Sequence, residues 1–310
     1  MKILITGGAG FIGSHLAEHL ASKKHKVRIL DNFSVGTWRP SAKSGIEVFE
    51  GDVRYMADIF PSVQWADVVY HLAAQISIDK SLELPQETMD INTKGTENIL
   101  EAIRVTNLGK RMILASTSEI YGTQHQKISE DSQNYPQSPY AVSKLAADKL
   151  CGVYHLVYGV RVIRARMFNT YGPRQRFDKF GAVIPRFVHS AIFHTQPIIY
   201  GTGEQRRDFM YVSDAVKAYE KLLDYPQLEG DVINIGTGNS VRINEVWNII
   251  SEITKSKLNP RYIPGRPGEV MKLQANNTVA SRCDIRPDIT LREGLNNYIS
   301  WARNAWGKEE

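Results

Sequence analysis

Short apolar segments alternate with amphipathic segments along the first half of the chain. The apolar segments, rich in Val, Ile and Leu, lie at residues 2–6, 26–31, 46–52, 67–74, 111–116 and 161–168. The residues between them show helical spacing, as in the stretch 88–105. Strands that alternate with helices favour a parallel sheet with helices on both faces. The first half of the chain is therefore predicted to be a doubly wound α/β fold.

The pattern loosens after residue 168, where Gly, Pro and Arg become more frequent. A strand is expected at 231–236 and a helix at 243–254. The last helix has apolar residues near helical spacing, which indicates a packed helix: Leu291, Leu295, Tyr298, Ala302 and Trp306. These features predict a first domain of residues 1–168 and a smaller α/β substrate domain of residues 169–310. Residues from about 208 to 240 are expected to return to the first domain.

Composition narrows the class of protein without changing this outline. Of 310 residues, 42% are hydrophobic and 23% are charged, as in ordinary globular proteins. The formal net charge of +5, with no basic tail or arginine-rich stripe, gives no reason to expect nucleic-acid binding. Two cysteines provide no disulfide framework, and no apolar run is long enough for a signal sequence or a membrane span. We therefore expect a cytoplasmic protein that does not enter a membrane.

The first chemical motif is the glycine-rich stretch that follows the first strand. Gly7 permits a tight turn, Gly10 allows a pyrophosphate to approach the backbone, and Gly13 allows the next helix to pack closely on the sheet. The N-terminus of that helix offers free N–H groups to an anion. Asp31 ends the second strand, where its carboxylate can accept from ribose hydroxyls and would repel a 2′-phosphate. This Rossmann-type arrangement predicts NAD as the cofactor, in preference to NADP.

The second motif places Tyr140 and Lys144 four residues apart, on one face of a predicted helix. An ammonium group near a phenol favours the phenolate, so Lys144 is expected to lower the pKa of Tyr140 towards neutrality. Such a phenolate can act as a general base on an alcohol. Thr117 and Glu119 lie two residues apart where the fifth strand ends, and would point the same way if the chain stayed extended. These four side chains are the candidate catalytic residues.

Further motifs follow one another along nearly the whole chain. In order, they are TGGAGFIGSHL, DNFSVG, GDV, HLAAQ, NTKGTENILEA, STSEIYG, SPYAVSK, FNTYGPRQ, RRDFMYVSDA, NIGTG and GRPGE. The set resembles the extended short-chain dehydrogenase/reductase family, in its nucleotide-sugar epimerase/dehydratase branch. The resemblance implies that a tyrosine takes the proton of a sugar hydroxyl while C4 gives a hydride to NAD. The product of that step would be a 4-keto sugar.

The resemblance also implies roles for individual residues. Thr117 would bond the sugar O4, Tyr140 would be the base, and Lys144 would hold the nicotinamide ribose. Cofactor contacts are implied for Gly7, Gly10, Phe11, Ile12, Gly13, Asp31, Asn32, Asp52, Val53, Leu72, Ala73, Ala74, Tyr140 and Lys144. Contacts with a nucleotide-diphosphate sugar are implied for Asn169, Val183, Tyr200, Arg207, Arg266 and Glu269. Of these, the arginines and Asn169 would hold phosphates, Tyr200 the base and Glu269 the ribose. No metal is expected.

Glu119 bears on which of the reactions that pass through a 4-keto sugar this protein carries out. Abstraction of the C5 proton needs a base near the ketone on a rigid element, and a carboxylate can supply it. Glu119 resembles the base of nucleotide-sugar 4,6-dehydratases, which favours that reaction over 4-epimerisation. The dTDP-glucose dehydratases have Asp-Glu where this chain has Ser118 and Glu119, so the proton for the leaving hydroxyl would come from Ser118 or a water. Uronate decarboxylases share the Ser-Glu pair but carry an arginine shortly before the tyrosine, and residues 136–139 contain none.

Two further interpretations stay open. A non-catalytic NAD-binding sensor would be expected to have lost Thr117, Tyr140 or Lys144, and all three are present. A sugar reductase that uses external NAD(P)H would consume its cofactor stoichiometrically.

Apolar residues on two helices bear on the oligomeric state. The helices expected at 88–105 and 140–158 carry more apolar residues than one buried face requires. In the family such helices pair into a four-helix bundle, so the resemblance implies a homodimer.

Overall fold

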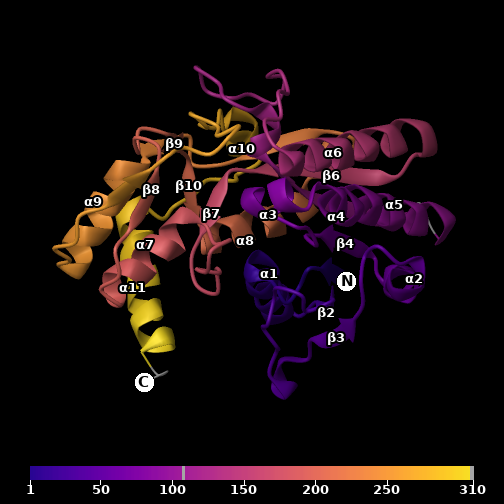
Figure 1. The fold of residues 1–310 in the computed structure, drawn as a ribbon. Coiled ribbons are helices and arrows are strands. Elements are labelled where there is room, and N and C mark those ends of the chain that lie inside the picture. The colour runs from indigo at the N-terminus through magenta and orange to yellow at the C-terminus, as the bar shows by residue number, and fades with distance from the viewer. Residues whose placement is uncertain (107–108, 308–310) are drawn as a thin grey trace.

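The computed structural model describes residues 1–106 and 109–307. Its largest element is a seven-stranded sheet in the order β11-β6-β5-β4-β1-β2-β3, with all neighbours parallel (Figure 1). The strands are β1 (Lys2–Thr6), β2 (Lys26–Asp31), β3 (Glu47–Glu50), β4 (Val68–His71), β5 (Arg111–Thr117), β6 (Arg161–Met167) and β11 (Val232–Ile235). The predicted parallel sheet is confirmed.

Helices cover both faces of this sheet, as in a doubly wound fold. They are α1 (Phe11–Ser22) and α8 (Val212–Lys221) on one face, and α2 (Met56–Trp65), α5 (Gly95–Thr106) and α6 (Pro139–Tyr158) on the other. Alternate residues of β1 serve the two faces: Ile3 and Ile5 join the apolar cluster under α1 and α8, whereas Leu4 joins the cluster under α2 and α5. Both faces are thus buried, which explains the nearly continuous apolar strands.

The remaining elements are short or belong mainly to the second half of the chain. The helices are α3 (Ile78–Glu83), α4 (Pro85–Met89), α7 (Val183–Ile192), α9 (Ile243–Thr254), α10 (Thr278–Arg282) and α11 (Leu291–Trp306). Single turns of 3₁₀-helix occur at Ala42–Ser44, Ser118–Tyr121, Leu222–Asp224 and Pro226–Leu228. The strands are β7 (Asn169–Tyr171), β8 (Ile198–Tyr200), β9 (Arg206–Arg207), β10 (Phe209–Tyr211), β12 (Val241–Arg242) and β13 (Arg261–Ile263).

The second half of the chain builds a separate apolar cluster beside the sheet. Three two-stranded pairs, β10 with β7, β12 with β9, and β13 with β8, lie next to α7, α9 and α11 (Figure 1). The cluster between these helices includes Phe187, Trp247 and Tyr298. The chain then returns to the large sheet, because β11 pairs with β6 along Val232 to Ile235. The division of the chain at residue 168 stays a prediction.

The helix predicted over residues 88–105 is interrupted in the structure. A π-helical segment, Asp90–Lys94, lies between α4 and α5. A π-turn inserts one residue into a helix and rotates the side chains before it relative to those after it. Asn92 in this segment is buried, with 1% of its surface exposed. Periodicity alone could not predict the insertion, since the apolar spacing on either side is that of an ordinary helix.

The length and composition of the helices bear on membrane association. Among the helices of the described residues, none is long and apolar enough to cross a membrane.

Candidate active site

Close backbone contacts shape the glycine-rich loop at the carboxyl edge of the sheet. Gly7 has φ of +71°, and a Cβ on it would lie 2.7 Å from the backbone nitrogen of Ala73. A Cβ on Gly13 would lie 2.2 Å from the carbonyl oxygen of Gly7. Gly10 is the N-cap of α1, so no side chain at that position covers the first N–H groups of the helix. The loop therefore leaves an open helix N-terminus, which suits a pyrophosphate.

Asp31 ties this loop to the end of β2. One carboxylate oxygen accepts from the backbone N–H of Ala9 and the other from that of Phe33, each at 2.9 Å. Burial raises the pKa of Asp31, while the backbone hydrogen bonds oppose this shift. Each oxygen retains lone-pair capacity, so the carboxylate can still accept from a ribose hydroxyl.

The other predicted cofactor residues lie around the same edge of the sheet. Asn32 donates to the Asp52 carboxylate at 2.9 Å. Burial raises the pKa of Asp52, but hydrogen bonds from Arg54 and Asn32 overcome this effect and lower the pKa to about 2. Val53 is buried, and the half-buried residues are Phe11, Ile12, Leu72, Ala73 and Ala74. The open helix end, the two carboxylates and this apolar border fit a dinucleotide.

Thr117 and Tyr140 meet where β5 ends and α6 begins. Ser138 accepts from the backbone N–H of Ala141 at 3.1 Å and so caps α6, which fixes Tyr140 in the first turn. The Thr117 hydroxyl forms a hydrogen bond with the Tyr140 phenol. Burial raises the pKa of Tyr140 to about 12; the bond to Thr117 opposes the shift and the charge of Glu119 adds to it.

Lys144 is directed towards the backbone of β5. Its ammonium group donates to the carbonyl oxygen of Ala115 at 2.6 Å, and burial lowers its pKa to about 8. From its spacing in the sequence, Lys144 was predicted to lower the pKa of Tyr140 towards neutrality. That expectation is wrong for this structure, because burial dominates and places the pKa of Tyr140 above its ordinary value.

Glu119 lies in the 3₁₀ turn Ser118–Tyr121, directly after β5. Its side chain is buried, with 9% of the residue exposed, and its backbone N–H donates to the Thr117 hydroxyl at 3.2 Å. Burial raises the pKa of Glu119, the cation of Arg207 opposes the shift, and the charge of Glu269 adds to it. The carboxyl group is thus held between the strand end and residues of the second half of the chain, in an environment that stabilises its acid form.

Asn92 connects several parts of this site and was not identified from the sequence. Its side-chain oxygen accepts from the backbone N–H of Gln75 at 2.7 Å. Its amide group donates to the carbonyl oxygen of Gln75 and to the Ser143 hydroxyl, each at 2.9 Å. Ser143 in turn donates to the carbonyl oxygen of Tyr140 at 2.7 Å. The π-helical turn that buries Asn92 therefore fixes the start of α6.

A buried histidine chain lies beside Asn92. Thr96 donates to the carbonyl oxygen of Asn92 at 2.6 Å, so it accepts from Nε2 of His71 at 3.0 Å. The Nδ1 atom of His71 then accepts from Thr6 at 2.7 Å, and Thr6 accepts from the backbone N–H of Ala73 at 3.3 Å. Burial lowers the pKa of His71 to about 3, so the ring is a neutral link between β1, β4 and the helix.

The predicted substrate residues gather on the second half of the chain. Tyr200 ends β8, and the guanidinium carbon of Arg266 lies 3.8 Å from the centre of its ring. Glu269 accepts from Gln205 at 3.1 Å. Arg207 contributes to the electrostatic environment of Glu119, so it lies near the strand-end residues. Apart from that link, the cofactor and substrate residues are held by different elements.

Two predicted substrate residues have different surroundings. Asn169 begins β7, and its side-chain oxygen is buried without a hydrogen-bond partner among residues 1–106 and 109–307. Val183 begins α7 and packs against the apolar cluster of the second half. Asn169 therefore keeps an unused polar atom, whereas Val183 contributes packing.

Arg186 is a further cation that the sequence analysis did not single out. It lies in the first turn of α7, three residues after Val183, and its guanidinium carbon is 5.7 Å from the centre of the Tyr200 ring. Burial raises the pKa of Tyr200, but hydrogen bonds and charge from Arg266 and Arg186 reverse the shift and lower it. Its helical spacing from Val183 was a signal that could have identified it.

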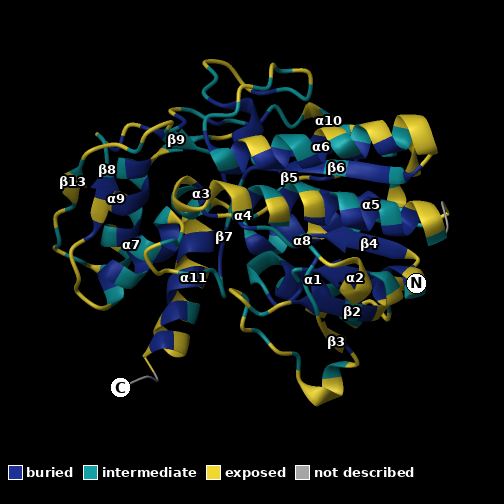
Figure 2. Ribbon diagram, turned by 45° about the vertical axis from the view of Figure 1, so that its right-hand side comes forward, coloured by how far each residue is buried: buried dark blue, intermediate teal, exposed yellow. Residues whose placement is uncertain are grey.

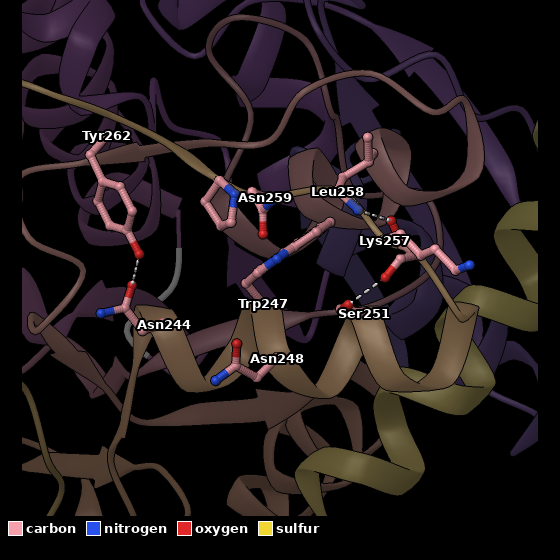
Figure 3. Close-up of a pocket in the computed structure, with 10 residues that line it drawn as sticks. Asn244, Trp247, Asn248, Ser251, Lys257, Leu258, Asn259 and Tyr262 are labelled. Atoms are coloured by element: carbon pink, nitrogen blue, oxygen red, sulfur yellow. Dashed lines mark hydrogen bonds between the residues drawn. The ribbon is translucent and has the colours of Figure 1, made fainter.

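A pocket on the outer side of the second half is separate from these residues (Figure 3). It has a volume of about 260 Å³ and lies between α9 and residues 256–262. Tyr262 donates to Asn244 at 3.1 Å across its rim, and Ser251 donates to the carbonyl oxygen of Ser256 at 2.8 Å. The residues that line it come from outside the predicted site.

Comparison with known proteins places these features in a family. The family model described as GDP-mannose 4,6 dehydratase matches residues 4–296. A UDP-N-acetyl-alpha-D-glucosaminuronate decarboxylase of Bacillus cytotoxicus is 36% identical, over 97% of this chain and 98% of that protein. A putative UDP-glucose 4-epimerase of Methanocaldococcus jannaschii is 34% identical, over 97% of this chain and 98% of that protein.

Solved structures agree with this placement. The dTDP-glucose 4,6-dehydratase of Streptomyces venezuelae, solved with NAD bound, has a TM-score of 0.93 at 27% identity and covers 100% of this chain and 99% of its own. The relatives differ in the reaction they are named for. The two curated relatives match this chain over nearly their full length, and the solved structure shares its fold. The chain belongs to the extended short-chain dehydrogenase/reductase family of NAD-dependent nucleotide-sugar epimerases and dehydratases.

Proposed function

We propose that the protein is an NAD-dependent nucleotide-sugar 4,6-dehydratase that acts through a 4-keto sugar. The observation that supports this reaction most directly is the placement of Glu119. The buried carboxyl group of Glu119 lies two residues after Thr117, and its pKa is raised by burial. A carboxyl group whose pKa is raised in this way can take up and release a proton, which is what an elimination next to a ketone requires.

The cofactor proposed for this reaction is NAD. Gly7, Gly10 and Gly13 would bring the pyrophosphate to the N-terminus of α1, and Asp31 would accept from a ribose hydroxyl. When bound, NAD accepts hydride from C4 of the sugar and later returns it to C6. The rest of the reaction depends on proton transfers by the protein.

The first proton transfer is proposed for Tyr140. Thr117, hydrogen-bonded to Tyr140, would bond the C4 hydroxyl and orient its proton towards the phenol oxygen. Tyr140, in its phenolate form, would take that proton as the C4–H bond loses its hydride, which gives a ketone at C4. Burial keeps water from the phenol, and Lys144 supplies a cation in the next helical turn.

The second proton transfer is proposed for Glu119. The ketone acidifies the C5–H bond, and the Glu119 carboxylate would take that proton. The C6 hydroxyl would then leave as water with this proton, passed from Glu119 through Ser118 or a water, which forms a C5–C6 double bond. Tyr140 would then give the first proton to C5, and with the hydride at C6 the product would be the 4-keto-6-deoxy sugar. One water is lost, and NAD is regenerated.

A 4-epimerase is the second candidate, because the Methanocaldococcus jannaschii relative carries that name. Epimerisation returns the hydride to the other face of C4 and needs no base at C5, so it would leave Glu119 without a role. A decarboxylase is the third candidate, because the Bacillus cytotoxicus relative carries that name. The cation of Arg207 near Glu119 supports it, since such a cation can hold a sugar carboxylate.

Replacement of Glu119 by Gln tests the proposal. The wild-type protein, incubated with NAD and UDP-glucose, dTDP-glucose, GDP-mannose or UDP-N-acetylglucosamine, is expected to convert one of them to a product that lacks one water. Glu119→Gln is expected to lower that rate about 10²- to 10⁴-fold, because the general base is lost. Mass spectrometry measures the product.

A matched control is Glu83→Gln, since Glu83 is an exposed residue of α3 and the charge change is the same. It is expected to keep the wild-type rate. A C4 epimer of unchanged mass, formed equally well by Glu119→Gln, would contradict the dehydratase proposal. Loss of CO₂ from a UDP-uronic acid would support the decarboxylase instead.

We also propose that two copies of the chain form a dimer through α5 and α6. Exposed apolar residues on these helices are Val105 of α5 and Val142, Val153, Leu156, Val157 and Tyr158 of α6. Both helices carry exposed stretches along their ribbons, coloured yellow in Figure 2. Leu156 is 83% exposed, which is unusual for a large apolar residue unless a partner covers it. Sedimentation velocity at micromolar concentration is expected to give a dimer, and Leu156→Glu is expected to give a monomer. A wild-type monomer under these conditions would contradict the proposal.

A further inference from the structure

An ion pair joins the two halves of the chain beside the proposed substrate site. Nη2 of Arg266 lies 2.9 Å from a carboxylate oxygen of Asp79. Asp79 belongs to the first turn of α3, which packs against α6 beside the large sheet. Arg266 follows β13, which pairs with β8 on the other half. The pair therefore links the Tyr200 region to the helices next to Tyr140.

Other contacts hold Arg266 in place without Asp79. Its guanidinium group lies over the Tyr200 ring, 3.8 Å from the ring centre. Its carbonyl oxygen accepts from the N–H of Glu269 at 3.3 Å, which closes a turn. Gly268 in this turn has φ of +69°, and a Cβ on it would lie 2.1 Å from the carbonyl oxygen of Gln137. The segment is thus fitted closely to its neighbours, and loss of Asp79 would leave these contacts intact.

The surroundings of Tyr200 are rich in cations. Arg186 and Arg266 both act on the Tyr200 ring, and the cation of Arg207 acts on Glu119, as does the charge of Glu269. Nε of Arg266 is buried and has no hydrogen-bond partner within the part of the chain that the structure describes. An arginine with an unused donor suits an oxyanion, since guanidinium and phosphate groups form paired hydrogen bonds. These side chains therefore fit a diphosphate.

We propose that Asp79 is a positioning residue that competes with the substrate diphosphate for Arg266. In the absence of nucleotide the Asp79 carboxylate pairs with Arg266 across the site, and the diphosphate must displace it in order to bind. The inference rests on the proposed function, because it takes a nucleoside diphosphate group as the ligand. It adds a residue whose charge sets the affinity for that group.

The position of the pair favours this competition over a structural role. The side chains of Arg266 and Asp79 are 25% and 27% exposed, and ion pairs with this access to solvent contribute little to stability. A carboxylate that stays near a bound diphosphate would also repel it. Both effects weaken nucleotide binding, so removing the charge of Asp79 should strengthen it.

Calorimetric titration with UDP, dTDP and GDP, each used separately, tests the inference. Asp79→Asn is expected to lower the dissociation constant of the nucleotide that binds by about threefold to tenfold. Asp79→Glu keeps the charge and is expected to bind like the wild type. Glu83→Gln removes the same charge from α3 at an exposed position and is expected to change nothing.

Salt dependence gives a readout that a purely structural role would not change. Binding to the wild type exchanges one ion pair for another, whereas binding to Asp79→Asn adds an ion pair. The affinity of Asp79→Asn is therefore expected to fall more steeply with added salt. In the Arg266→Ala background, Asp79→Asn is expected to change the dissociation constant much less, because the guanidinium group for which Asp79 and the diphosphate compete is absent.

The outcomes separate this inference from the function on which it rests. If the wild type binds one of the three nucleotides and Asp79→Asn binds it no more tightly, the competition is refuted and the proposed function stands. If neither the wild type nor the variants bind any of them, the competition is refuted, and the proposed function is refuted as well only if no nucleotide sugar is converted. If Asp79→Asn tightens nucleotide binding by the same factor in the Arg266→Ala background, the role given to Arg266 is overturned.

Discussion

Tyr140→Phe is expected to lower the rate of product formation about 10³-fold, because the phenol oxygen that takes the C4 proton is removed. The ring and its packing are retained, and α6 keeps its cap at Ser138. The variant should therefore fold and bind NAD like the wild type. A stopped-flow measurement of a single turnover would follow the first step directly. The signal is the absorbance or the fluorescence of the reduced nicotinamide.

The control is Tyr158→Phe, which removes an exposed phenol oxygen from the same helix. It is expected to react at the wild-type rate. If Tyr140→Phe retained full activity, the proton acceptor would have to be another group, and the shared mechanism of all three candidate reactions would be refuted.

The largest expected loss of stability follows from Asp148→Asn. Asp148 is fully buried, and its carboxylate accepts from Nε and Nη2 of Arg166 at 3.0 and 2.9 Å and from Ser116 at 2.7 Å. The substitution would leave the Arg166 guanidinium, which is 2% exposed, without its counter-charge. We expect the free energy of unfolding to fall by about 3–5 kcal/mol, measured by urea denaturation.

The exposed pair of Asp224 with Lys221 gives the control. The side chain of Asp224 is 67% exposed, so Asp224→Asn is expected to change the free energy of unfolding by less than about 0.5 kcal/mol. An equal and small effect of both substitutions would show that the buried pair contributes little.

The same pair predicts a pH dependence with a definite sign. Burial raises the pKa of Asp148, but hydrogen bonds and charge from Arg166 outweigh this and hold the pKa below its ordinary value. A carboxyl group whose pKa is lower in the folded state stabilises the fold above its unfolded pKa. That contribution is lost as the pH falls through the folded pKa. The free energy of unfolding of Asp148→Asn should therefore decrease less than that of the wild type as the pH falls through this range.

The sequence predicted the central fold because its signals are local. The apolar strands, the glycines after β1 and the acidic end of β2 each fix a neighbouring backbone conformation or contact. The helix at 243–254 was predicted with the bounds that the structure has. Its apolar spacing is regular, and its end is followed by a residue with positive φ, Lys255.

The site was less accessible to sequence reasoning where contacts join distant parts of the chain. Spacing placed Tyr140 and Lys144 on one face, but it could not show that the ammonium group bonds to Ala115. The pairing of Asp79 with Arg266 spans 187 positions and leaves no local trace. Asn92 was missed for a related reason, since its role depends on a π-helical turn that the apolar spacing does not reveal.

The seventh strand of the large sheet has a consequence for synthesis on the ribosome. β11 joins β6 only after residues 169–231 have been made, so the nascent first half presents the unpaired backbone of β6 during that interval. Open edges of this kind recruit other strands, and chaperones commonly shield them. The chain is therefore most exposed to misassembly midway through translation, and passes that stage when residue 235 leaves the exit tunnel.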